Sequence, residues 1–278
     1  MNIVNIIEEI ERVDPEINDR MNPRRSAIKN MGSLGSKIAM AGLPLALASL
    51  FKKAYGQQTP ASVNEVLNFA LTLEYLEAEF YTLGVANTGL MAQGTTAGTG
   101  ALTNIRDHEN QHVAFLKSVL GAAAVAKPVF DFTAKGTFPT VFSSYDTFLA
   151  VAQVFEDTGV RAYKGQAPAL LGNKVVLTAA LNIHSVEARH AAHIRYMRKT
   201  RGGAAASMKP WITGSNDTGI GAVVNGSYAG EENLSQGGVT ITSLPGVSGN
   251  ISTNAATEAF DEPLTKAQIL AIVSPFIV

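Results

Sequence analysis

Four glutamates and two histidines recur along this chain in an order that could hold a pair of metal ions. A single glutamate is followed by a Glu-x-x-His motif, and the same arrangement then occurs a second time. The six residues are Glu74, Glu109, His112, Glu156, Glu187 and His190. Carboxylates that are buried together repel one another unless cations lie between them. Two divalent ions would supply four positive charges to balance the four carboxylates.

The Glu-x-x-His spacing explains how such ions would be bound. Residues three apart on a helix project side by side, so the carboxylate could bridge both ions while the imidazole binds one of them. Oxygen-rich ligands with one nitrogen for each ion favour iron or manganese. The chain has no cysteine, which excludes thiolate ligands, disulfides and a cysteine nucleophile. We therefore predict a cofactor of two divalent iron or manganese ions.

Other residues near the motifs have more than one interpretation. Glu77 could replace Glu74 as a ligand, although Tyr81, seven residues after Glu74, favours Glu74. Tyr81 and Tyr163 are candidates for hydrogen bonds to ligand carboxylates, or are ordinary aromatic core residues. His193 could be an extra ligand or could donate a hydrogen bond to a ligand. The favoured interpretation is an ordinary histidine whose hydrogen bonds are made elsewhere.

The positions of the other histidines and the overall composition exclude some classes of function. All five histidines lie on the two Glu-x-x-His segments, and His108 and His184 are predicted to be peripheral. The chain has 278 residues, of which 46% are hydrophobic and 16% are charged, enough to build a sizeable core. Its net charge is -1 and it has no basic run, which argues against a nucleic-acid partner.

Each candidate ligand falls within a segment whose apolar residues have helical spacing. These segments predict helices at about residues 62–84, 103–120, 144–163 and 173–201. Ser62 and Glu65 fit a capping box at the first helix start, and Gly84 is a candidate stop. Residues 85–102 are rich in Gly, Thr and Ala and predict a loop. Residues 121–143 predict a long crossover that packs on the bundle through its apolar residues.

The predicted bundle domain spans residues 57–201, and the segments on either side of it differ from it in composition. Residues 202–262 are rich in Gly, Asn, Ser and Thr, which predicts an irregular extension, either coil or short strands near 239–242, anchored by Trp211. Thr265 and Gln268 fit another capping box, which opens a short final helix within the extension 202–278.

Residues 1–56 predict a leader. Arg24, Arg25 and Lys29 precede a short apolar stretch at 38–51, and this pattern resembles a twin-arginine export signal. The stretch is too short for a confident membrane span, so we expect none after processing. We expect a periplasmic or secreted protein. The alternative is that Arg24 and Arg25 are surface charges before a core or interfacial helix.

The motifs together resemble the ferritin-like superfamily. Residues 73–81, 156–163 and 260–276 are similar to an exported ferritin-like family that includes desiccation-related proteins. The resemblance implies an all-α fold: an antiparallel four-helix bundle with a long crossover between its second and third helices. It also implies a dinuclear site, but it says little about the reaction.

These observations lead to one main hypothesis and two rivals. The main hypothesis is an exported di-metal protein, an oxidase, peroxide scavenger or iron-handling protein, whose partner would be dioxygen or peroxide. The first rival is a manganese catalase-like enzyme, which shares the ligand pattern. The second is a non-catalytic structural or stress-related protein of the envelope or matrix. The protein could also form a homo-oligomer. The C-terminal extension argues against a storage cage, because it would crowd the outside of such a shell.

Overall fold

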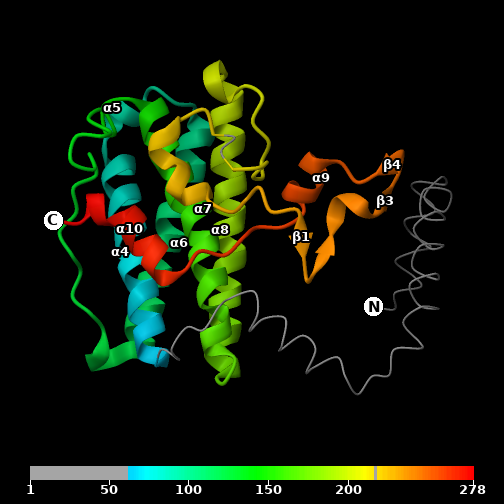
Figure 1. Cartoon of the computed structure of the whole chain (residues 1–278). Coiled ribbons are helices and arrows are strands. Elements are labelled where there is room, and N and C mark those ends of the chain that lie inside the picture. The colour runs from blue at the N-terminus through cyan, green and yellow to red at the C-terminus, as the bar shows by residue number, and fades with distance from the viewer. Residues whose placement is uncertain (1–61, 216–217) are drawn as a thin grey trace, which may run out of the picture. The chain divides into compact units, whose positions relative to one another are not determined.

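Four long helices lie side by side and form a bundle in the computed structural model (Figure 1). The structure describes residues 62–215 and 218–278, so the predicted leader lies outside the described residues. The long helices are α4 (Val63–Ala86), α6 (Thr96–Leu120), α7 (Tyr145–Gln166) and α8 (Lys174–Arg201). Within the described ranges, no helix is both long and apolar enough to cross a membrane. The predicted all-α bundle is confirmed.

The helix starts are fixed by the side chains that the sequence places there. Ser62 Oγ accepts a hydrogen bond from the Glu65 backbone amide at 3.2 Å, and Glu65 Oε2 accepts one from the Ser62 amide at 2.6 Å. This is the predicted capping box at the start of α4. Thr265 and Gln268 form the second one, at the start of α10 (Lys266–Val273).

The predicted loop at 85–102 is wrong over most of its length. Helix α5 (Thr88–Met91) and the first part of α6 occupy it, and Thr95 caps α6 by accepting from the Gly98 amide. A β-carbon at Gly98 would lie 3.0 Å from the Tyr145 hydroxyl and 3.2 Å from Met197 Cε. The glycine therefore makes room for side chains of other helices, which outweighs its low helix propensity.

Gly84 has a similar role, and its prediction as a helix stop is also wrong. It lies within α4, where the ring of Phe148 packs so closely against it that a β-carbon would collide with the ring. Two features that read as chain breaks in the sequence are thus points of close helix packing.

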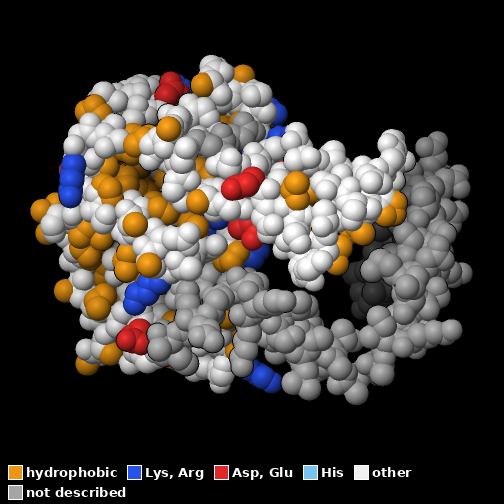
Figure 2. Space-filling view, viewed as in Figure 1, with side chains coloured by type: hydrophobic (Ala, Val, Ile, Leu, Met, Phe, Trp, Pro, Cys, Tyr) orange, Lys and Arg blue, Asp and Glu red, His pale blue; other side chains and the backbone are white. Residues whose placement is uncertain are grey.

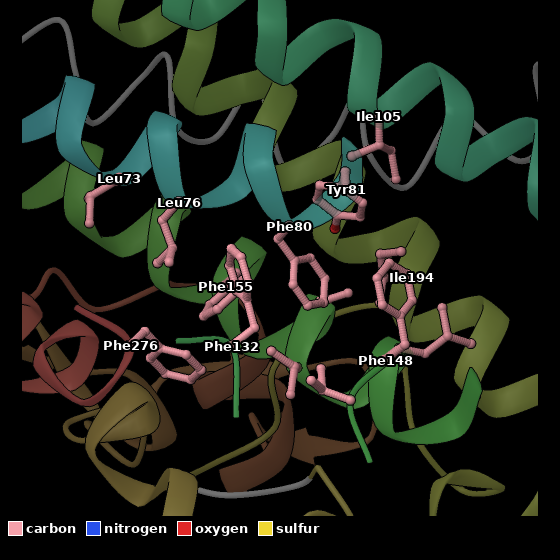
Figure 3. Close-up of a cluster of buried hydrophobic side chains, with 14 of the residues drawn as sticks. Leu73, Leu76, Phe80, Tyr81, Ile105, Phe132, Phe148, Phe155, Ile194 and Phe276 are labelled. Atoms are coloured by element: carbon pink, nitrogen blue, oxygen red, sulfur yellow. The ribbon is translucent and has the colours of Figure 1, made fainter. Parts of the chain in front are cut away.

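Figure 3 shows a cluster of buried apolar side chains, many of them aromatic, that packs within the bundle. The ring of Phe80 stacks on that of Phe148 with centroids 4.5 Å apart. Phe155 meets Phe80 edge to face at 5.1 Å, and Phe276 from the C-terminus meets Phe155 at 4.9 Å. Aromatic pairs in these geometries add to the stabilisation from buried area. The cluster therefore joins α4, α7 and the end of the chain.

The crossover between α6 and α7 packs on the bundle as predicted. Phe132 and Val141 are buried in the same core, and the crossover pairs with the end of the chain. The Asp131 amide donates to the Phe276 carbonyl at 2.8 Å, and the Val278 amide donates to the Val129 carbonyl at 3.0 Å. The crossover begins with the short helix η1 (Gly121–Ala123), and the chain ends after η6 (Ser274–Phe276).

The extension combines coil with short elements, and a strand covers only the first two residues of the predicted strand region at 239–242. Its elements are η3 (Gly203–Ala205), η4 (Ala222–Tyr228), β1 (Ser235–Gln236), β2 (Val239–Thr240), η5 (Ile241–Ser243), β3 (Pro245–Gly246), β4 (Gly249–Asn250) and α9 (Thr253–Glu258). Strand β1 pairs with β2 and β3 pairs with β4, both antiparallel. The predicted anchor is wrong, because Trp211 is 48% exposed.

Buried ionic contacts hold the extension instead. Asp157 on α7 accepts from Arg195 on α8 through both oxygens, at 3.0 and 2.6 Å, and from the Tyr228 hydroxyl at 2.6 Å. Arg161 on α7 forms an ion pair with Glu231 at 2.9 Å and donates to the Glu262 carbonyl at 2.6 Å. Because each charge has a partner, these groups can be buried at an acceptable cost.

A cavity of about 400 Å³ lies outside the helical core, against the extension. Its lining is mostly apolar and comes from the crossover, α7, η4 and the C-terminal helices, for example Phe138, Val154, Val224 and Ile272. Figure 2 shows that apolar side chains gather on the face around α10. None of the six predicted metal ligands lines this cavity.

Candidate metal centre

The structure brings all six predicted ligands together within the bundle. Helix α4 supplies Glu74, and α7 supplies Glu156. Helices α6 and α8 each supply a glutamate and a histidine from one motif. All four glutamates are fully buried, and the side chains of His112 and His190 are 12% and 6% exposed. Burial of four acids in one place is costly unless something compensates their charge.

The six residues form two overlapping groups that could each hold an ion. One group is Glu74, Glu109, His112 and Glu187, and the other is Glu109, Glu156, Glu187 and His190. Within each group, one candidate ligand atom per residue lies within 4.8 Å of all the others. Each group contains one single glutamate, one histidine and both motif glutamates. Glu109 and Glu187 are therefore shared by the two groups.

Both histidines turn the same ring nitrogen toward the carboxylates. The Nδ1 atom of His112 lies 3.1 Å from both Glu74 Oε2 and Glu109 Oε2, and 3.4 Å from Glu187 Oε1. The Nδ1 atom of His190 lies 2.8 Å from Glu109 Oε1 and 3.3 Å from Glu156 Oε2. These short separations leave room for single ions rather than for a larger group.

Several of these buried atoms have no hydrogen-bond partner, although others of the cluster lie close to them. They are Glu109 Oε1, Glu156 Oε2, Glu187 Oε1 and Oε2, and His190 Nδ1. Buried polar atoms are rarely left unpaired, and an ion is one of the accepted reasons. The donor set therefore fits two oxygen-preferring cations.

The charges of the cluster shift the pKa of both histidines upward. Burial alone would lower the pKa of His112, but contacts with Glu109 and Glu74 raise it to about 10. Burial likewise opposes the charge of His190, yet the charge of Glu156 and the contact with Glu109 raise the pKa of His190 to about 10. Without metal, both imidazoles are therefore protonated at neutral pH and act as counter-ions.

The pKa values of the four ligand carboxyl groups do not all shift in the same direction. Burial raises the pKa of Glu74 to about 8, and burial with neighbouring acids raises the pKa of Glu187 well above its usual value. Burial also raises the pKa of Glu156. Glu109 differs because its contacts with both histidines outweigh burial and lower its pKa to about 2. When no metal ions are bound, protons therefore reduce the negative charge of the cluster.

The two tyrosines hydrogen-bond ligands, which decides between their two interpretations. The Tyr81 hydroxyl donates to Glu156 Oε1 at 2.5 Å, and the Tyr163 hydroxyl donates to Glu74 Oε1. Each tyrosine lies seven residues after one single glutamate but bonds the other one, on the facing helix. The contacts orient both single glutamates and link α4 to α7.

Glu77 is buried beside the cluster but belongs to neither group. Its neighbour on α7 is Gly159, where a β-carbon would lie 3.3 Å from Glu77 Oε1 and 2.8 Å from Glu187 Oε2. The glycine inside α7 therefore provides space for carboxylates. The structure favours Glu74 over Glu77 as the ligand on α4, because only Glu74 lies within ligand distance of the other members.

The three remaining histidines lie outside both groups. His193 is exposed, and its ring neighbours Tyr196. Nδ1 of His184 lies 3.0 Å from the Val160 carbonyl oxygen. His108 is exposed but contacts His190, with its Nδ1 atom 3.0 Å from His190 Nε2. Sequence reasoning missed this contact; the available signal was that His108 lies four residues before His112, on the same side of α6.

A four-helix bundle with a glutamate on two helices and Glu-x-x-His on the other two is the architecture of carboxylate-bundle metal proteins. The family model of the ferritin-like domain matches residues 62–200, which is half of the chain, and the protein belongs to this family. None of the curated proteins compared with the chain matches it.

Proposed function

We propose that the protein holds two divalent ions, iron or manganese, in this cluster and acts on dioxygen or peroxide. The observation that carries the proposal is the convergence of five unpaired, buried ligand atoms from three helices on one interior space. The balance of charge points the same way, because four carboxylates would match two divalent cations. The absence of sulfur ligands and the two nitrogens favour iron or manganese.

The residues of the cluster would have different roles in holding the ions. Glu109 and Glu187, which belong to both groups, would help to hold both ions. Glu74 with His112, and Glu156 with His190, would each help to hold one of them. Tyr81 and Tyr163 would hold the single glutamates in place through their hydroxyl groups. Bound iron or manganese would supply the redox chemistry, and the buried setting would exclude bulk water from it.

The first test is metal reconstitution followed by turnover. Protein stripped with a chelator and reloaded anaerobically with Fe²⁺ or Mn²⁺ is expected to hold about two ions per chain by elemental analysis. The manganese form should then be assayed for oxygen release from hydrogen peroxide, and the iron form for oxidation of Fe²⁺ by dioxygen.

Each result of this test has a distinct meaning. Peroxide turnover by the manganese form would favour the catalase-like function, and ferrous oxidation would favour an oxidase or iron-handling function. Two bound ions without turnover would favour the non-catalytic envelope or matrix protein. Less than about half an equivalent of either metal would contradict the proposed site, because the ligand set is built for two.

We also propose that the protein is exported in folded form by the twin-arginine route, as its narrower resemblance to exported ferritin-like proteins implies. Arg24 and Arg25 before the apolar stretch support this. Replacing both by lysine is expected to retain the protein in the cytoplasmic fraction of a bacterium with this pathway. Equal export of the two forms, measured by immunoblot of cell fractions, would contradict the proposal.

A further inference from the structure

An exposed histidine is the outer neighbour of one buried candidate ligand. Nδ1 of His108, on α6, lies 3.0 Å from Nε2 of His190, on α8. The two ring planes are only 9° apart, and their centroids are 5.2 Å apart. Because the nitrogens are much closer than the centroids, the rings meet through their edges. This geometry is that of a hydrogen bond between imidazoles.

The direction of this hydrogen bond follows from what His190 must do. Its other nitrogen, Nδ1, faces Glu109 and Glu156, so a bound ion would need the lone pair of Nδ1. A neutral imidazole with a free Nδ1 carries its hydrogen on Nε2. His190 Nε2 then donates to His108 Nδ1, and the hydrogen bond selects the tautomer that binds metal.

The second candidate histidine ligand lacks such a partner. Nδ1 of His112 also faces the carboxylates, but among the described residues its Nε2 atom has no hydrogen-bond partner. His108 immediately precedes the motif glutamate Glu109, and the corresponding position before Glu187 is Val186. The two halves of the centre are therefore alike in their ligands but differ in what supports the imidazole.

We propose that His108 is a positioning residue that holds His190 in its metal-binding tautomer and makes the two metal positions unequal. This inference rests on the proposed function. The position that contains His190 and Glu156 would bind its ion more tightly than the position that contains His112 and Glu74. Outer partners of this kind typically change metal affinity by about 10- to 100-fold.

Anaerobic calorimetric titration of the stripped, full-length protein with Mn²⁺ tests the proposal. The wild type is expected to bind two ions in two unequal steps. In His108→Ala the tighter step should weaken by about 10- to 100-fold while the other stays unchanged. His108→Gln should recover much of the loss, because its amide oxygen can accept the same hydrogen bond. Glu156→Gln identifies the affected step, since Glu156 belongs only to the group of His190.

A matched control separates positioning from a general effect of losing an exposed histidine. His193→Ala removes an exposed histidine three residues beyond His190 and should titrate like the wild type. A second readout is the ring N–H of His190 in Zn²⁺-loaded protein labelled with ¹⁵N-histidine. Its exchange with solvent should be slow in the wild type and fast in His108→Ala.

The outcomes that overturn the inference differ from those that overturn the function. If His108→Ala binds both ions as the wild type does, with an equally protected ring N–H, His108 does not position His190, while the metal site stands. Equal steps in the wild type would also refute the inequality. If the wild type binds no ions, the proposed function fails and this inference fails with it.

Discussion

Replacing Glu109 and Glu187 together by alanine is expected to abolish metal uptake, from about two ions per chain to essentially none. Both glutamates belong to both groups, so each position would lose two of its four candidate ligands. The measurement is elemental analysis after anaerobic reconstitution and removal of unbound metal. Circular dichroism of the metal-free variant checks that the bundle remains folded, since the change removes buried acids rather than apolar contacts.

Matched variants make this prediction specific. Glu79→Ala removes another glutamate of α4 that pairs with Lys127 outside the cluster, and it should leave metal uptake unchanged. Glu74→Gln and Glu156→Gln should each weaken one position only, because each residue belongs to one group. Two ions retained by the double alanine variant would show that the ligand assignment is wrong.

The metal-free protein is expected to lose stability as pH rises from about 6.5 to 10, the interval between the unfolded pKa of histidine and its raised folded values. His112 and His190, with pKa values raised to about 10, stabilise the fold below the unfolded pKa, and this contribution disappears as pH passes 10. Glu74, raised to about 8, changes in the same direction. A loss of about 2 kcal/mol would lower Tm by roughly 4–8 °C.

The measurement is Tm by circular dichroism in the presence of a chelator at several pH values, with metal-loaded protein as the control. Loaded protein should change less, because ions replace the protons in the cluster. Glu109 acts in the opposite sense: its pKa is lowered to about 2, so its contribution is lost only in strong acid. A Tm of the metal-free protein that is constant or rises over this pH interval would contradict the prediction.

The ligand cluster was predictable because it depends on local periodicity. A glutamate within the apolar stripe of a helix points toward the core, as the stripe does. A histidine three residues after such a glutamate lies on the same side of the helix. All six residues therefore converge as expected, while metal binding itself stays a prediction. The spacing argument for Glu74 over Glu77 was not sound, because Tyr81 hydrogen-bonds Glu156 rather than Glu74. Glu77 is also buried beside the cluster, so only the assembled bundle separates it from the two groups.

Features that depend on contacts between distant segments could not be predicted. Gly84 was predicted as a helix stop, and Gly98 lay within the predicted loop at 85–102. The side chains that pack against these two glycines, Phe148 and Tyr145, are far away in the sequence. The partnership of His108 with His190 spans 82 residues. The crosswise tyrosines were predictable as candidates, but not in their pairing.

The extension shows the same limit. Its composition correctly indicated irregular structure, but the residues that hold it are buried charges rather than its tryptophan. Asp157 and Arg161 lie on α7, within a segment where the sequence pattern drew attention to Glu156 and Tyr163. Their partners Tyr228 and Glu231 lie in a Gly- and Asn-rich stretch where periodicity carries no information.

The crosswise hydrogen bonds of the two tyrosines have a consequence for how the centre is assembled. Tyr81 orients a glutamate that comes 75 residues later, and Tyr163 orients one that comes 89 residues earlier. A chain that has emerged from the ribosome up to the crossover would carry three of the six candidate ligands and would lack the hydrogen bond from Tyr163 to Glu74. The complete centre would then form only after the second helical hairpin has been synthesised. A protein with both ions bound would therefore be one in which both hairpins are folded together.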